Sequence, residues 1–117
     1  MEIKEKVEIE AENKTLVDAV IDTGADISVF NEETLLAIGA KHTFNTEMLT
    51  VGETLGTKPV YGIKSMKIRN CKVPIFFVIG GRKNLIGHDV LQKMKARIDE
   101  GTGTIEFPES NRNYVEV

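Results

Sequence analysis

Hydrophobic and charged residues alternate along the first ten residues of the chain. Apolar side chains stand at Ile3, Val7 and Ile9, and most positions between them are charged. This period of two predicts a strand with one buried face and one wet face. A polar turn follows, and the β-branched and aliphatic residues over 15–21 predict a second strand that pairs with the first as a hairpin.

Two short helices are expected among the strands. The first is predicted over residues 31–38, because Asn31 can accept hydrogen bonds from the first turn and acidic residues follow it. Gly39 stands where the end of a helix favours a left-handed residue. The second helix is predicted over residues 88–95, after Gly87, since its apolar residues recur at helical spacing.

The rest of the chain predicts further strands. Residues 48–51 and 60–66 are expected to be the arms of a long hairpin, with a glycine-bearing tip over 52–59. The apolar run over 73–79 predicts one buried strand, and residues 97–107 predict a last hairpin. The pattern therefore indicates an all-β domain with one or two short helices.

Composition and charge narrow the class of protein. A chain of 117 residues, 41% hydrophobic and 28% charged, is expected to form a single globular domain over residues 1–117. Its net charge of −3 provides no basic field for nucleic acid or an anionic membrane, so neither partner is expected. The single Cys71 cannot form an internal disulfide, and no signal peptide or apolar span is seen. We expect a cytoplasmic protein.

Three aspartates at regular spacing raise the question of a cation site. Asp18, Asp22 and Asp26 would share one face of a helix, as metal-binding carboxylates can. The β-branched residues around them favour a strand that ends in a turn, so the spacing is interpreted as accidental. With one cysteine and two histidines far apart, neither a metal nor another cofactor is expected.

The remaining candidate chemistry lies in residues 22–25, which read Asp-Thr-Gly-Ala at the end of an apolar strand. A glycine-bearing hairpin, the segment Leu-Ile-Gly over 85–87 and a short helix follow in that order. In this arrangement, over nearly the whole chain, the sequence resembles the retropepsin-like aspartic proteases. The resemblance implies a closed acid-protease barrel with a flap hairpin, formed as a homodimer.

The resemblance also implies roles for the residues of the motif. Asp22 would be the catalytic carboxylate, and Thr23 would hydrogen-bond across the dimer axis to the partner's loop. Gly24 would let the substrate backbone approach closely. Ala25 lacks the hydroxyl that some relatives place near the carboxylate, and Asp26 would contact the substrate main chain or pair with a basic residue.

Outside the motif, the resemblance points to the hairpin and to the second helix. A flap over residues 48–63 would close on an extended peptide, with Leu55 and Val60 as candidate substrate contacts and Tyr61 as an alternative packing residue at its base. His88 stands where viral members usually carry an arginine paired with the aspartate that matches Asp26. Two arrangements stay open for His88: a pair with Asp26, or an exposed side chain without that partner.

Peptide hydrolysis by carboxylates alone needs two of them sharing one proton, and the motif occurs once. The resemblance therefore implies an aspartic endopeptidase in which two chains pair about a twofold axis and act on extended polypeptide without a cofactor. The alternative is a non-catalytic dimeric module that binds peptides or serves as a scaffold, because a fold does not determine an activity.

Overall fold

The computed structural model describes residues 2–50 and 53–107, with the side chains of residues 2–45 and 57–107. Within these residues the chain forms eleven strands and two short helices. Their bounds are β1 (Lys4–Glu10), β2 (Lys14–Ile21), β3 (Val29–Asn31), α1 (Glu32–Ala37), β4 (Lys41–Thr50), β5 (Glu53–Gly62), β6 (Ser65–Ile68), β7 (Cys71–Pro74), β8 (Phe77–Gly81), β9 (Leu85–Ile86), α2 (His88–Met94), β10 (Arg97–Asp99) and β11 (Thr104–Glu106).

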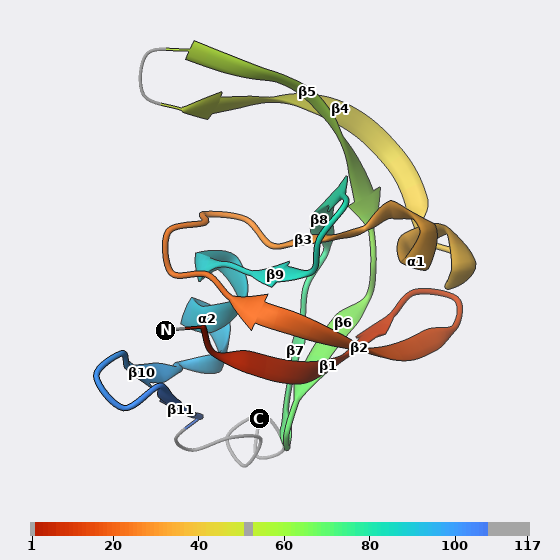
Figure 1. Ribbon diagram of the computed structural model, residues 1–117. Coiled ribbons are helices and arrows are strands. Elements are labelled where there is room, and N and C mark those ends of the chain that lie inside the picture. The colour runs from red at the N-terminus through yellow and green to blue at the C-terminus, as the bar shows by residue number, and fades with distance from the viewer. Residues whose placement is uncertain (1, 51–52, 108–117) are drawn as a thin grey trace.

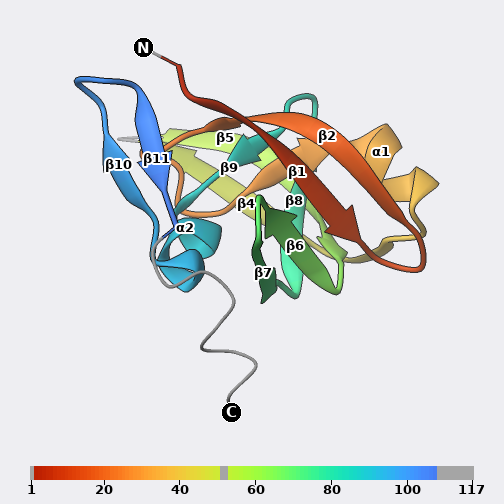
Figure 2. The same cartoon turned by 90° about the horizontal axis from the view of Figure 1, so that it is seen from below.

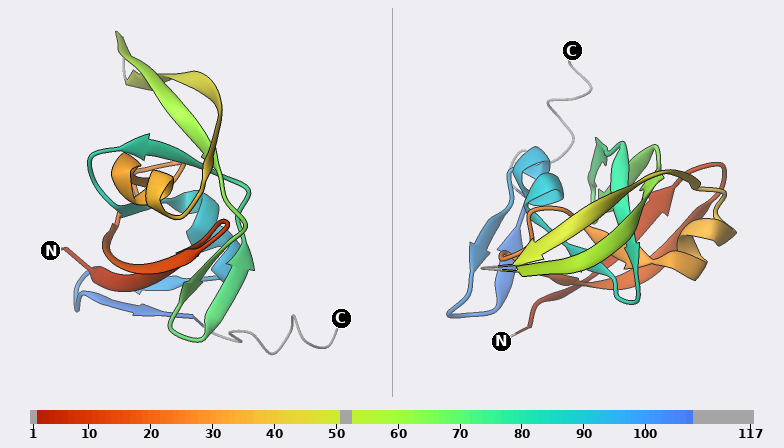
Figure 3. Two further views of the ribbon diagram at one scale, coloured as in Figure 1. Left: turned by 90° about the vertical axis from the view of Figure 1, so that its right-hand side faces the viewer. Right: turned by 90° about the horizontal axis from the view of Figure 1, so that it is seen from above.

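One nine-stranded sheet makes up most of the molecule, in the order β4-β5-β8-β3-β9-β2-β1-β6-β7, and β10 and β11 form a separate two-stranded sheet. The large sheet curls into a half-barrel (Figures 1 and 3). The pairs β2–β9 and β3–β8 are parallel. Seen from below, the β10–β11 hairpin lies beside α2 (Figure 2). The expected all-β fold with two short helices is confirmed.

Local sequence rules account for the elements at the N-terminal end. The predicted hairpin is β1–β2, and its inward residue Val7 is fully buried opposite Val17. Helix α1 begins after Asn31, whose Oδ1 accepts hydrogen bonds from the N–H groups of Glu33 and Thr34. Gly39 follows the helix with a φ of 81°, as expected. These predictions are confirmed.

The expected single strand over residues 73–79 is wrong. The structure has two strands there, β7 paired with β6 and β8 paired with β5 and β3. Pro74 ends β7, because proline has no N–H to continue a ladder. The chain then changes partners, and Ile75 donates its N–H to the carbonyl of Lys64.

The expected hairpin also differs from the one observed. β4 and β5 are ten residues each, so residues 53–59 belong to a paired strand instead of a loop tip. Pro59 is tolerated opposite Asn45, because β8 pairs with β5 only from Val60 onward and no third strand needs the missing N–H. The predicted arm over 60–66 is divided, since β6 leaves to pair with β1. The β4–β5 hairpin projects beyond the rest of the sheet (Figures 1 and 3).

The core lies inside the curl of the sheet and is closed by the two helices. Leu35 of α1 and Val90 and Met94 of α2 are buried in it. The largest fully buried side chains come from β1, β3, β6, β9 and both helices, among them Phe30, Ile9, Leu35, Met66, Ile68, Ile86 and Met94. Neither helix of the described residues is long and apolar enough to cross a membrane.

Candidate active site

Asp22 is the first residue after β2, at the point where the strand turns into a loop. Its N–H donates to the carbonyl of Ile86 at 2.9 Å, which extends the parallel pairing of β2 with β9 by one bond. Its Oδ1 accepts the N–H of Gly24 at 3.0 Å, and its carbonyl accepts the N–H of Ala25 at 3.2 Å. The half-exposed carboxylate is thus held in a defined place at the end of β2.

The loop from Asp22 to Ser28 is fastened to the start of α2. The N–H of His88 donates to the carbonyl of Ala25 at 2.8 Å, and the N–H of Asp89 donates to the carbonyl of Asp26 at 3.2 Å. Gly87, the N-cap, has no side chain to satisfy these groups. Loop carbonyls therefore take the place of a capping side chain, and the loop and the helix become one unit.

A partly buried hydrogen-bond network joins the same two segments through Ser28 and Asp89. Asp89 Oδ1 accepts three hydrogen bonds: from Ser28 N–H at 3.0 Å, from Ser28 Oγ at 2.8 Å and from Val90 N–H at 2.9 Å. Ser28 Oγ in turn accepts the N–H of Gly87 at 2.9 Å. Ser28 is fully buried, and no buried side-chain nitrogen or oxygen of the described residues lacks a partner. The sequence pattern did not point to Ser28 or Asp89, although a serine inside an apolar run was a usable signal.

Gly87 makes the close approach of loop and helix possible. A Cβ on this residue would lie 2.7 Å from the carbonyl oxygen of Ala25 and 3.0 Å from the carbonyl carbon of Ile27. Both neighbours are backbone atoms, which move only if the loop moves. Glycine at this position therefore sets the distance between the loop that carries Asp22 and α2.

Thr23 and Gly24 lie at the exposed surface of the loop. The Thr23 hydroxyl has no hydrogen-bond partner among the described residues, which leaves it available to a second chain. Gly24 is not in the left-handed region, and a Cβ there would meet only Asp22 Oδ1, at 3.4 Å. The backbone of the turn therefore does not depend on glycine at this position, and the close approach of substrate at Gly24 stays a prediction.

Asp26 and His88 are both exposed, and no ion pair or hydrogen bond joins their side chains in the part of the chain that the structure describes. Of the two arrangements left open for His88, the structure has the exposed side chain without Asp26. Asp18 lies on β2 and pairs with Lys6 at 2.6 Å. Over residues 2–50 and 53–107, no three histidine, cysteine, aspartate or glutamate side chains gather in a way that could hold a metal ion.

The base of the β4–β5 hairpin is firmly packed. Tyr61 is 3% exposed and donates its hydroxyl hydrogen to Glu32 Oε2. Desolvation, followed by the hydrogen bond to Glu32 and its charge, raises the pKa of Tyr61 to about 12. Val60 is 5% exposed, which leaves little of it for contact with a ligand. The side chain of Leu55 lies outside the described residues.

Comparison with known proteins agrees with this architecture. A family model described as retroviral aspartyl protease matches residues 2–99. Among solved structures, the chain is similar to the crystal structure of the retroviral protease-like domain of Ddi1 from Leishmania major. The TM-score is 0.64 and the identity 21%, over 93% of this chain and 90% of that one, which shows a shared retropepsin-like fold. No curated protein matches the chain.

Proposed function

Since the chain belongs to the retroviral aspartyl protease family, we propose that it is an aspartic endopeptidase that acts as a homodimer on extended polypeptide. The observation that carries this proposal is the placement of Asp22. Its carboxylate is half-exposed at the end of β2, on a loop locked to α2, beside a Thr23 hydroxyl with no partner in the described chain. These features support a loop that presents a carboxylate and meets a second copy of the chain.

The chemistry requires the second copy. One ionised carboxylate takes a proton from water, the water oxygen bonds to the peptide carbonyl carbon, and the other, protonated carboxyl group donates its proton to the carbonyl oxygen. The first carboxyl group then gives the proton from water to the amide nitrogen, the C–N bond breaks, and a hydroxyl of the intermediate returns a proton to the second group. Each chain supplies one Asp22, so a twofold axis beside this residue would complete the pair.

The β4–β5 hairpin is proposed as the flap, over residues 48–63. An extended peptide beneath it would add backbone hydrogen bonds in the manner of a neighbouring strand. Leu55 remains a predicted contact for that peptide, whereas Val60, the other residue expected there, is buried and has little surface to offer. We further propose that residues 1–117 act as one domain in the cytoplasm, which the free and buried thiol of Cys71 supports.

The test is the Asp22→Asn variant, assayed on a denatured protein from about pH 3 to 7, with and without a statine-type inhibitor. The amide is nearly isosteric but cannot ionise, so cleavage should vanish while fold and dimer persist. Glu33→Gln, an exposed carboxylate on α1 that is changed to an amide in the same way, is the matched control and should keep full activity. Unchanged turnover of Asp22→Asn would overturn the catalytic assignment, and peptide binding without cleavage by the unmodified protein would establish the non-catalytic alternative.

A further inference from the structure

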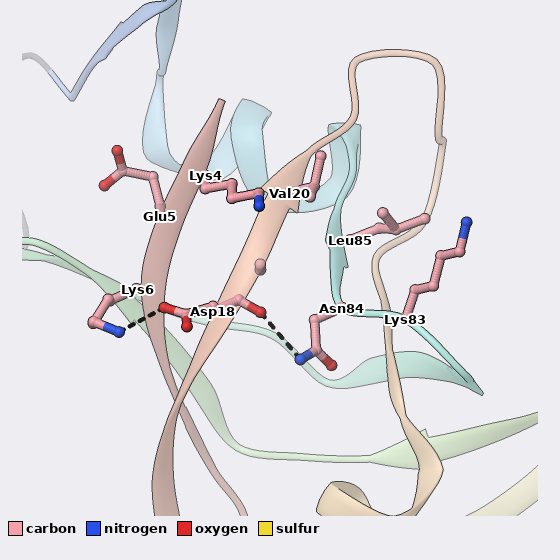
Figure 4. Close-up of a pocket in the computed structure, with 9 residues that line it drawn as sticks. Lys4, Glu5, Lys6, Asp18, Val20, Lys83, Asn84 and Leu85 are labelled. Atoms are coloured by element: carbon pink, nitrogen blue, oxygen red, sulfur yellow. Dashed lines mark hydrogen bonds and ion pairs between the residues drawn. The ribbon is translucent and has the colours of Figure 1, made fainter. Parts of the chain in front are cut away.

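A hollow of ≈ 510 Å³ lies beside the strand that leads to Asp22. Its walls come from β1, β2 and the segment that enters β9 (Figure 4). The apolar part includes Ala19, Val20 and Leu85, and charged side chains of β1 and Lys83 surround it. An apolar surface with a charged rim fits an amphipathic side chain better than a purely hydrophobic one.

The hollow adjoins the candidate catalytic group. Val20 pairs with Leu85 in the β2–β9 ladder, and Asp22 follows Val20 by two positions. Two residues along a strand span about 7 Å, and residues two apart face the same side of a sheet. A peptide whose scissile bond reached Asp22 would therefore carry neighbouring side chains past Val20 and Leu85.

The charges of the hollow do not balance. Asp18 is held by Lys6 at 2.6 Å, and Glu5 is held by Arg69 through bonds of 3.1 and 2.9 Å. Both acidic groups are thus engaged. Lys4 and Lys83, on opposite walls, have no acidic partner among the described residues (Figure 4).

We propose that this lysine hollow, formed around Val20 and Leu85 between Lys4 and Lys83, binds an acidic side chain of the peptide substrate. The inference rests on the proposed function and adds a substrate class to it. The methylene groups of a glutamate would lie on the apolar floor while its carboxylate lies between the two ammonium groups. The chain as a whole carries a net charge of −3, so the positive charge is local and matches a short acidic segment better than an extended polyanion.

The test compares pairs of fluorogenic peptides that carry glutamate or glutamine at one position. That position lies within about four residues of the scissile bond, because only these residues of an extended peptide bound at Asp22 would lie near the hollow. We expect kcat/KM to favour one glutamate peptide by about three- to tenfold, as two exposed ion pairs allow. The preference should shrink with added salt. It should be abolished in Lys83→Glu and in Lys4→Glu, because each change leaves one positive and one negative charge at the hollow. It should persist in Lys14→Glu, which makes the same charge change at the far end of the β1–β2 hairpin.

Binding of the same peptides to the Asp22→Asn protein, followed by fluorescence anisotropy, separates the two proposals. Cleavage and binding without any preference for glutamate, or a preference that survives Lys83→Glu and Lys4→Glu, would overturn the lysine hollow and leave the protease proposal intact. A glutamate preference in binding that both substitutions abolish would uphold the hollow even if the unmodified protein cleaves nothing. The absence of cleavage by the unmodified protein would instead overturn the protease proposal.

Discussion

Replacement of Ser28 by alanine tests whether the hydrogen bonds among Ser28, Gly87 and Asp89 hold the loop that carries Asp22. The change removes Oγ, which donates to Asp89 Oδ1 at 2.8 Å and accepts the N–H of Gly87 at 2.9 Å. Asp89 keeps two of its three donors, the N–H groups of Ser28 and Val90. The N–H of Gly87 loses its partner at a buried position.

The magnitude follows from these two losses. A hydrogen bond to a charged group contributes about 1.5–3 kcal/mol, and a buried N–H left without a partner costs about 1–3 kcal/mol. We therefore expect Ser28→Ala to lower the free energy of unfolding by about 3 kcal/mol. With a urea m-value of about 2 kcal/mol/M, the midpoint should fall by about 1.5 M.

The assay is urea unfolding at one protein concentration, since association would otherwise change the apparent stability. Ser65→Ala is the matched control, because Ser65 is also buried and its Oγ reaches Glu10 Oε1 only at 3.4 Å. Ser65→Ala should lower the free energy of unfolding by about 0.5–1 kcal/mol. Asp89→Asn keeps an acceptor oxygen and should cost less than Ser28→Ala. Equal losses for Ser28→Ala and Ser65→Ala would refute the network as the fastening of the loop.

Four further outcomes are expected. Gly87→Ala should lower the free energy of unfolding by about 2–3 kcal/mol and remove most of the cleavage activity, because its Cβ would meet Ala25 O at 2.7 Å. A wild-type melting temperature would contradict this. Because the folded pKa of Tyr61 is raised to about 12, the stabilisation that this residue contributes should be complete below about pH 10 and be lost as the pH rises toward 12. Urea midpoints measured against pH should therefore fall over this range, and Tyr61→Phe should reduce that fall. Specific activity should fall on dilution toward the dimer dissociation constant, whereas constant activity where sedimentation shows only monomer would refute a shared site. Because one Asp22 must act as a base and the other as an acid, cleavage should follow a bell-shaped pH profile centred at about pH 4–6; a maximum above about pH 8 would contradict the mechanism.

Local rules in the sequence were enough for several elements and for the position of the motif. The alternation over residues 3–9 predicted β1, and Asn31 predicted the start of α1, because periodicity and capping act within a few residues of the chain. Asp22 was placed correctly at the end of a strand for the same reason. Thr23 was expected to face a partner, and the structure leaves it exposed, although the contact itself stays a prediction.

Only the tertiary structure decided how distant segments meet. Residues 73–79 read as one strand, but Pro74 and the separate partners of β7 and β8 divide them, and no local pattern specifies which strand pairs with which. Ser28 and Asp89 are 61 residues apart in the sequence, so their hydrogen bonds depend on the packing of α2 against the loop that carries Asp22. The same holds for Lys4 and Lys83, whose charges face one hollow only because β9 pairs with β2 and β2 pairs with β1.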